Sequence, residues 1–196
     1  MSTIRTFIAI ELTDEAHIAL TDLQYRLKAI TPPKTVRWTA PENIHLTLHF
    51  LGDVAGKDIG RVKAALETAA LACRPFTLTL TGLGCFPNLR RPRIVWAGIA
   101  GETGRLGELH RDLGEKLKVI DFQPETRPYS PHLTIGRVKK VPPRHLSQLS
   151  AVLEKEQPKV ETLATWPVQA VSLFSSDLKP AGPVYTRLAR AELTNG

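Results

Sequence analysis

The sequence predicts an α+β protein with two pseudo-symmetric lobes of antiparallel strands, outer helices, and an active-site cleft between the lobes. The order strand, helix, strand, helix occurs twice, in residues 5–71 and again in residues 94–156. The strand patterns are short and alternate between apolar and polar residues, whereas strands of a buried parallel sheet read as continuous apolar runs. We therefore expect a single domain, residues 1–196, built from two duplicated lobes.

The elements of the first unit follow from the periodicity of its residues. Aromatic and β-branched residues indicate strands, and apolar residues that recur every three or four positions indicate helices. Two consecutive prolines, Pro32 and Pro33, end the first helix because proline lacks the amide hydrogen that a helix interior needs. The expected elements are a strand at 5–12, a helix at 16–30, a short strand at 36–38, a strand at 44–52, a helix at 59–69 and a strand at 76–81.

An irregular, basic segment from Gly82 to Arg93 separates the two units and is predicted to be a loop. Its cluster Arg90-Arg91-Pro92-Arg93 is interpreted as a solvated loop, with contact to RNA as the lesser alternative. The elements expected after it are a strand at 94–99, a helix at 106–117, a strand at 131–137, a helix at 143–153 and closing strands at 168–174 and 184–188.

Composition narrows the class of protein. The hydrophobic share of 42% and the charged share of 23% are ordinary for a soluble globular domain. No run approaches the roughly 20 apolar residues that a membrane helix needs, and Cys73 and Cys85 have no metal-binding or redox spacing. We expect a reduced, cytoplasmic monomer. The net charge of +7 favours a negatively charged partner but does not separate RNA from a nucleotide.

Two tetrapeptides, His45-Leu46-Thr47-Leu48 and His132-Leu133-Thr134-Ile135, carry the strongest functional signal. Their histidines lie 87 positions apart (132 − 45), and the same interval separates the first strands of the two units, at Phe7 and Ile94. Side chains alternate between the faces of a strand, so each histidine shares a face with the threonine two residues later. One such match arises easily by chance, but two in matching frames predict one site built from two halves.

Two imidazoles and two hydroxyls suit the hydrolysis of a phosphodiester. One group must take a proton from water and another must protonate the departing alkoxide, and imidazole, with a pKa near 6.5, serves either purpose near neutral pH. Thr47 and Thr134 are placed to hydrogen-bond the non-bridging phosphate oxygens, and Arg137 could clamp the same phosphate. A strained 2′,3′-cyclic phosphate fits this set and needs no cofactor.

His49 raises the alternative of a metal site, because simple alternation puts it on the face of His45. On a strand the two would lie roughly 13 Å apart, at about 3.3 Å per residue, which is too far for shared ligation of one ion. We therefore expect no metal site. His17, His110 and His145 lie in helical patterns and are expected at the surface, and the three tryptophans are expected in packing roles.

The paired motifs give the chain a resemblance to the 2H phosphoesterase superfamily, specifically the RNA 2′,3′-cyclic phosphodiesterases, also called 2′-5′ RNA ligases. The matching segments span nearly the whole sequence: 5–10, 43–52, 84–87, 131–137 and 182–185. The resemblance implies metal-free hydrolysis of an RNA 2′,3′-cyclic phosphate to a 2′-phosphomonoester. It further implies that His45 is the proton donor, His132 is the proton acceptor, and Thr47 and Thr134 hold the phosphate.

Two alternatives stay open at this point. The same histidines could run the reverse attack and join a 5′-hydroxyl to a cyclic phosphate end by a 2′-5′ bond, as in tRNA halves. The chain could also be a non-catalytic module that binds RNA through its basic surface, with passive histidines. The partner expected in each case is an RNA or oligonucleotide.

Overall fold

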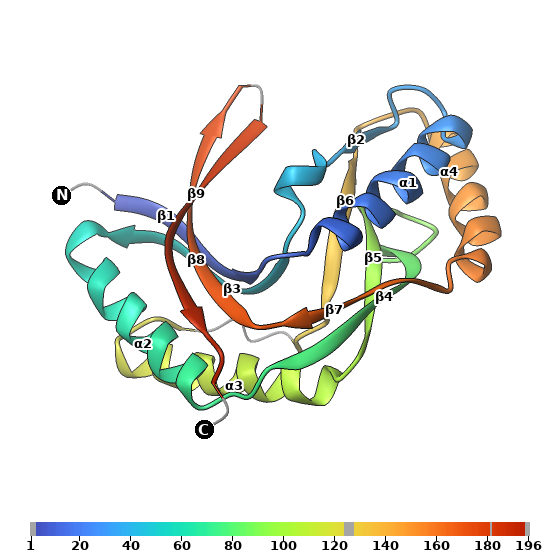
Figure 1. Ribbon diagram of the computed structural model, residues 1–196. Helices are drawn as coiled ribbons and strands as arrows, with labels where there is room; N and C mark the ends of the chain where they lie inside the picture. The colour runs from blue at the N-terminus through green and yellow to red at the C-terminus, as the bar shows by residue number, and fades with distance from the viewer. Residues whose placement is uncertain (1–2, 124–127, 181, 195–196) are drawn as a thin grey trace.

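A computed structural model describes residues 3–123, 128–180 and 182–194 of the chain and has the predicted α+β architecture (Figure 1). Its main elements are, in order, β1 (Thr3–Ile10), α1 (Asp14–Ile30), β2 (Val36–Trp38), β3 (Leu46–Ala55), α2 (Ile59–Leu71), β4 (Phe76–Phe86), β5 (Ile94–Gly101), α3 (Thr103–Val119), β6 (His132–Val138), α4 (Pro143–Glu156), β7 (Thr162–Val168), β8 (Ala170–Lys179) and β9 (Gly182–Glu192). Single turns of 3₁₀-helix lie at Pro41–Asn43, Gly56–Asp58 and Gln157–Lys159.

The strands form two antiparallel sheets, which confirms the predicted fold class. Sheet A has the order β3-β1-β8-β9, and sheet B has the order β2-β6-β5-β4-β7. Each sheet therefore takes strands from distant parts of the sequence, and neither lobe is a continuous half of the chain. The two predicted motif strands occupy matching places, because β3 pairs with β1 in sheet A and β6 pairs with β5 in sheet B.

The pairing register of β1 with β3 recurs in that of β5 with β6 at an offset of 87 residues. The matching Cα pairs are Ile8–His49 with Val95–Gly136, Ala9–Thr47 with Trp96–Thr134, and Ile10–Leu46 with Ala97–Leu133. A bulge also recurs. Leu48 and Ile135 are each an extra residue without a Cα partner on the neighbouring strand. A bulge bends its strand and re-aims the side chains that follow it, so both motif strands are bent at the same place.

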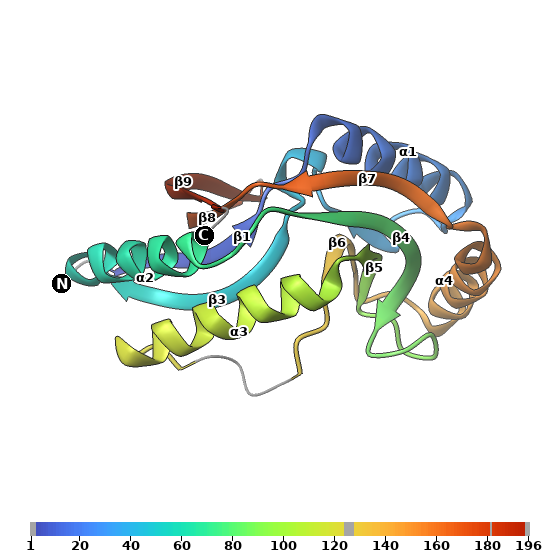
Figure 2. The ribbon, with the colours of Figure 1, turned by 60° about the horizontal axis from the view of Figure 1, so that its bottom comes forward.

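The helices that cover each sheet come from both repeated units. Helices α2 and α3 pack against each other on sheet A, whereas α1 contacts β7 and α4 contacts β4 in sheet B. Figure 1 shows α2 and α3 below β1 and β3, and Figure 2 shows the two helices with that side turned forward. The chain thus leaves sheet A after β1, covers sheet B with α1, and returns to sheet A with β3.

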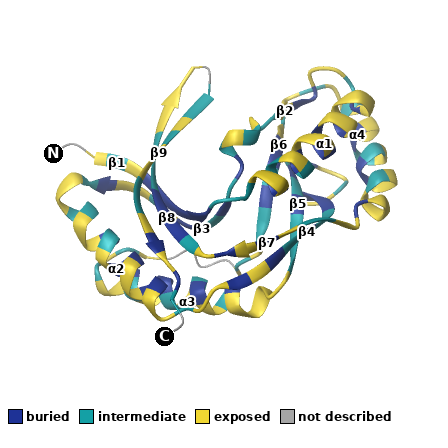
Figure 3. Cartoon of the chain, in the orientation of Figure 1, coloured by how far each residue is buried: buried dark blue, intermediate teal, exposed yellow. Residues whose placement is uncertain are grey.

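One continuous cluster of buried apolar side chains joins the two lobes. It contains residues of both sheets and of all four helices, among them Leu20, Leu66, Leu113 and Leu153. Figure 3 shows the buried residues along the strands and on the inward sides of the helices. None of the described helices is long and apolar enough to cross a membrane.

Two details differ from the expected elements. Strand β4 runs on to Phe86, through the first part of the segment predicted to be a loop, because it pairs with β5 along that length. Strand β7 has no counterpart among the predicted elements. Its Pro167 obscures the strand pattern, but β7 is an edge strand of sheet B, where proline removes no ladder hydrogen bond that the sheet requires.

Candidate active site

His45 lies just before β3 and is held from two sides. Its Nδ1 lies 3.0 Å from the carbonyl oxygen of Asn43, and its ring stacks on Phe7 with centroids 4.5 Å apart. Tyr185 of β9 meets the same ring edge-on at 5.2 Å. Aromatic contacts on both sides leave the imidazole little freedom to rotate.

His132, the first residue of β6, is held in the same way. Its Nδ1 lies 2.7 Å from the carbonyl oxygen of Ser130, which stands 87 positions after Asn43. Phe86 packs edge-on against its ring at 4.9 Å. A carbonyl oxygen only accepts hydrogen bonds, so Nδ1 of each histidine carries the proton. The lone pair of each neutral ring therefore lies on Nε2.

Burial governs the protonation of His45. Burial lowers the pKa of His45 from its usual 6.5 to about 4, although the hydrogen bond to Asn43 acts in the opposite direction. The aromatic rings around His45 provide no charge that would stabilise an imidazolium. In the free protein His45 is therefore neutral at pH 7, with a lone pair on Nε2.

Thr47 and Thr134 occupy equivalent places on the two sheets. Thr47 pairs with Ala9, and Thr134 pairs with Trp96. Both threonines are partly exposed between buried neighbours, so their side chains lie on the open face of each strand. Arg137 follows three residues after Thr134, and it is exposed.

Because of the bulges, the residue three positions after each threonine lies on the same face of the sheet as that threonine. Phe50 pairs with Phe7, which is two residues from the partner of Thr47 on β1. Phe7 itself stacks on His45, so Phe50, which is 56% exposed, lies on the face of the site. Arg137 has the matching place on sheet B, opposite Ile94. The site therefore has an aromatic ring on one lobe where it has a guanidinium on the other.

Tyr129 connects the two motif strands. Its hydroxyl donates to the carbonyl oxygen of Thr47 over 3.1 Å, and it stands one residue before Ser130, which anchors His132. Strands β3 and β6 also contact each other directly. The structure thus brings the two predicted motifs together, with Tyr129 as a direct link.

His49 does not share the face of His45, and the simple alternation used for it was wrong. Because of the bulge at Leu48, His49 pairs with Ile8, and it is buried. Its Nε2 lies 2.9 Å from the carbonyl oxygen of His110, and the two rings stack. No group of three or more histidine, cysteine, aspartate or glutamate residues in the described ranges is placed to hold a metal ion.

Two histidines expected at the surface have closer neighbours. The ring of His110 is stacked on His49 and also on Tyr129, whose centroid lies 3.9 Å away. Burial, and then the charge of His49, lower its pKa to about 4. His17 is only partly exposed and lines a pocket beside His45. Helical spacing located His17 and His110 on helices, but it could not predict which residues pack against each helix.

The pocket beside His45 has a volume of about 620 Å³ and is lined mainly by sheet A and the segment before β3. Phe7, Phe174 and Tyr185 supply its aromatic wall, and Asn43 ties it to the β8–β9 hairpin by donating to the carbonyl oxygen of Pro183 over 3.2 Å. His132 is not among its lining residues.

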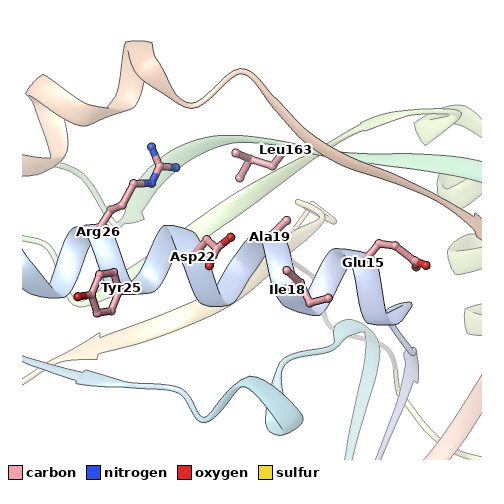
Figure 4. Close-up of a pocket in the computed structure, with 7 residues that line it drawn as sticks. All are labelled: Glu15, Ile18, Ala19, Asp22, Tyr25, Arg26 and Leu163. Atoms are coloured by element: carbon pink, nitrogen blue, oxygen red, sulfur yellow. The ribbon is translucent and has the colours of Figure 1, made fainter.

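A second pocket, of about 690 Å³, lies on the outside of α1 against β7 (Figure 4). Glu15, Ile18, Asp22, Tyr25 and Arg26 of α1 line it, together with Ala19 and Leu163. It contains none of the predicted site residues and no histidine. It therefore has no pair of histidines like His45 and His132 among its lining residues.

Sequence reasoning missed Phe50, Tyr129 and Tyr185 as parts of the site. A signal for Phe50 was available, because position 50 is 87 residues before Arg137 and the repeat places them alike. The repeat gave no such signal for Tyr185, which lies in the matching segment 182–185 but reaches His45 only because β9 joins sheet A through tertiary packing. Tyr129 precedes the second motif, but its bond to Thr47 depends on how the two strands meet.

Known proteins resemble this chain over most of its length. A family model described as LigT-like phosphoesterase matches residues 10–96 and 98–185. The RNA 2′,3′-cyclic phosphodiesterase of Methanothermobacter thermautotrophicus is 36% identical over 184 residues, which cover 93% of this chain and 95% of the relative. That of Thermotoga maritima is 31% identical, with 98% and 97% covered.

Solved structures give the same picture of the fold. The structure of TT0787 of Thermus thermophilus matches with a TM-score of 0.77 at 30% identity, over 97% of this chain and 98% of the other. That of E. coli LigT complexed with 3′-AMP matches with a TM-score of 0.75 at 24% identity, over 99% and 100%, and supports the fold alone. Since the family model and the curated relatives span most of its length, the chain belongs to the LigT-like phosphoesterase family.

Proposed function

We propose that this chain hydrolyses the 2′,3′-cyclic phosphate at the end of an RNA or oligonucleotide and leaves a 2′-phosphomonoester. Its family and the names of its relatives support this activity. The observation that carries it is the matched pair of histidines, each with Nδ1 hydrogen-bonded to the carbonyl oxygen two residues earlier. This arrangement leaves two oriented Nε2 atoms, one just before β3 and one on β6, which supports a separate proton transfer by each.

The proposed reaction is a single displacement at phosphorus. Nε2 of His132 takes a proton from water as the water oxygen bonds to phosphorus. The bond between phosphorus and O3′ breaks, and Nε2 of His45 gives its proton to O3′. Each positioned acid or base contributes on the order of 10²–10⁴ in rate. Both roles are filled by side chains, so we propose that the reaction needs no metal ion.

The remaining site residues act on the phosphate oxygens. The hydroxyls of Thr47 and Thr134 donate to the non-bridging oxygens, and the guanidinium of Arg137 offsets the negative charge that they carry. Fixed donors of this kind stabilise the transition state because they need no reorganisation during the reaction. The equivalent registers of the two threonines support a role for one donor on each side of phosphorus.

The acid role of His45 requires a proton that the free protein does not hold at neutral pH. Burial favours the neutral ring, but a bound phosphate brings a negative charge next to Nε2. An opposite charge within a few ångström raises the pKa of an imidazole. We therefore propose that the substrate itself causes His45 to take up the proton that it later gives to O3′.

The matching registers also support the view of residues 5–71 and 94–156 as repeated units of a single domain. We propose that each unit contributes one histidine, one threonine and one bulged strand. Neither unit contains a complete acid and base pair. The activity should therefore require both units in one folded chain.

The proposed function is tested by incubating the protein with an oligonucleotide that ends in a 2′,3′-cyclic phosphate, with EDTA present. We expect conversion to a 2′-phosphomonoester at an undiminished rate. Supplying an acceptor with a 5′-hydroxyl distinguishes the alternatives, because joined product would indicate 2′-5′ ligation. Tight binding of the oligonucleotide without turnover would instead indicate a non-catalytic module and would contradict the proposal.

A further inference from the structure

Arg37 and Arg137 lie directly opposite each other on β2 and β6. Cα atoms of such antiparallel partners are about 4.5–5.5 Å apart, so the two guanidinium groups start from neighbouring positions. Both residues are exposed, and in the described part of the chain neither forms an ion pair with a carboxylate. Like charges directly opposite each other destabilise a sheet, so this pair is unfavourable until an anion binds between or above it.

Both arginines lie on the face of sheet B that carries the second motif. Arg137 pairs with Ile94, and Thr134 pairs with Trp96, two residues along β5. Residues two apart on a strand share a face, so Arg137 and Thr134 share one as well. Arg37 is the register partner of Arg137 and therefore extends the same face by one strand.

The position of Arg37 is fixed by close packing of β2 onto Gly136. A Cβ atom added at Gly136 would lie 2.6 Å from Cγ1 of Val36 and 3.2 Å from the ring of Trp38. Val36 and Trp38 flank Arg37, so both neighbours of this arginine are packed against β6. Its Cα is consequently held by a short, well-packed strand rather than by a loop.

Arg137 lies toward the reaction centre. Its positive charge, like that of Arg5, acts to lower the pKa of Tyr185, although burial is the larger influence and raises it. Tyr185 in turn touches the ring of His45. The charge of Arg137 therefore acts on Tyr185 of the other sheet, and Arg37 is one strand farther out on the face that carries Arg137.

We propose that Arg37 binds the phosphate on the 5′ side of the terminal nucleoside, next to the cyclic phosphate held by the histidines and Arg137. In RNA that phosphodiester is the nearest other anion to the reacting group. A guanidinium matches the geometry of phosphate oxygens with paired donors. This inference rests on the proposed function and assigns RNA ends, rather than isolated nucleoside 2′,3′-cyclic phosphates, as the preferred substrate.

A binding measurement, which needs no turnover, tests the proposed contact between Arg37 and the 5′-phosphate. Calorimetric titration compares adenosine 2′-phosphate with adenosine 2′,5′-bisphosphate, which differ only in the 5′-phosphate. We expect this group to tighten binding to the unaltered protein by about tenfold, the usual scale of a charge-assisted hydrogen bond. In Arg37→Ala the gain should disappear while adenosine 2′-phosphate binds as before. Arg37→Lys, which keeps the charge, should retain part of the gain.

Arg111→Ala is the matched control, because it removes the same charge from an exposed site on α3, which packs on sheet A with α2. It should keep the full gain from the 5′-phosphate. Two results would overturn the proposal: no gain in the unaltered protein, or an equal loss for both ligands in Arg37→Ala. The second result would mean that Arg37 contacts the reacting phosphate or stabilises the fold.

Kinetics separate this inference from the proposed function. For a 2′,3′-cyclic nucleotide, kcat/KM should be unchanged in Arg37→Ala, whereas for its 5′-phosphorylated form it should fall about tenfold. With a single-stranded oligonucleotide, the salt dependence of binding should weaken by about 0.7 in log–log slope. An unaltered protein that hydrolyses neither nucleotide would refute the proposed function, while the titration would still decide the role of Arg37.

Discussion

His45 and His132 share a local geometry but stand in different surroundings. Both rings donate from Nδ1 to the carbonyl oxygen two residues earlier. His45, however, is enclosed by Phe7 and Tyr185, and burial lowers its pKa to about 4. The tetrapeptides alone predicted the two histidines, from residue type and spacing. They could not predict the surroundings of His45, which come from β1 and β9.

The pKa of His45 should depend on what is bound beside it. NMR titration of its imidazole protons should give a pKa of about 4 in the free protein, because burial disfavours the charged ring. Saturation with adenosine 2′-phosphate should raise this pKa, because the phosphate places a negative charge near Nε2. An unchanged pKa in the saturated protein would mean that His45 does not contact the phosphate.

Tyr129→Phe should impair positioning across the two motif strands. The change removes the bond from the Tyr129 hydroxyl to the Thr47 carbonyl but retains the ring stacked on His110. We expect the free energy of unfolding to fall by about 1 kcal/mol and kcat to fall several-fold with little change in KM. Tyr25→Phe, at a 75% exposed tyrosine on α1, is the control and should change neither quantity.

At the scale of elements, the sequence predicted most strands and helices but not how they assemble. Periodicity located α1, α2, β5 and β6 within a few residues because each buries one face or one stripe. It could not predict that α1 covers sheet B, because that choice depends on contacts with β7. The sequence did not predict β7 because it contains Pro167. Proline is acceptable in a strand only at a sheet edge, and the edge position of β7 is known only from the assembled sheet.

Gly136→Ala should loosen β2 from β6. The added Cβ would lie 2.6 Å from Cγ1 of Val36, so β2 must shift or the side chain must move. We expect a loss of about 1–3 kcal/mol in the free energy of unfolding, as for other overpacked sites. Urea titration measures it. Gly107→Ala in α3 meets nothing within 4 Å and should instead be neutral or stabilise by up to about 1 kcal/mol.

If β2 also positions Arg37, Gly136→Ala should reduce the gain in affinity from a 5′-phosphate as well. A variant with unchanged stability would show that β2 tolerates the added methyl group and that the close approach to Gly136 is not required.

At the scale of the whole molecule, the offset of 87 residues was the most informative feature of the sequence. It linked two strands in different sheets and correctly indicated that they present equivalent residues. Cleft geometry could not be inferred in the same way. Strands β8 and β9 complete sheet A from the end of the chain, and they bring Phe174 and Tyr185 to His45.

Acid should destabilise the fold before most carboxylates titrate. The folded-state pKa values of His45 and His110 are about 4, below the usual 6.5. Stability from their neutral forms is fully present above pH 6.5 and is lost as the pH falls from 6.5 toward 4. The Tm should therefore fall between pH 7 and pH 5. His110→Phe keeps the ring stack but removes one of these groups, so its Tm should fall less. An equal fall would contradict the assignment of His110.

The central claim is that His45 and His132 act together on one cyclic phosphate. It is tested most directly by the hydrolysis rate of His45→Ala and His132→Ala on an RNA with a 2′,3′-cyclic phosphate end. Each variant should lose at least about a hundredfold in kcat while keeping its circular dichroism spectrum. Full activity in either variant, with the fold intact, would contradict the claim.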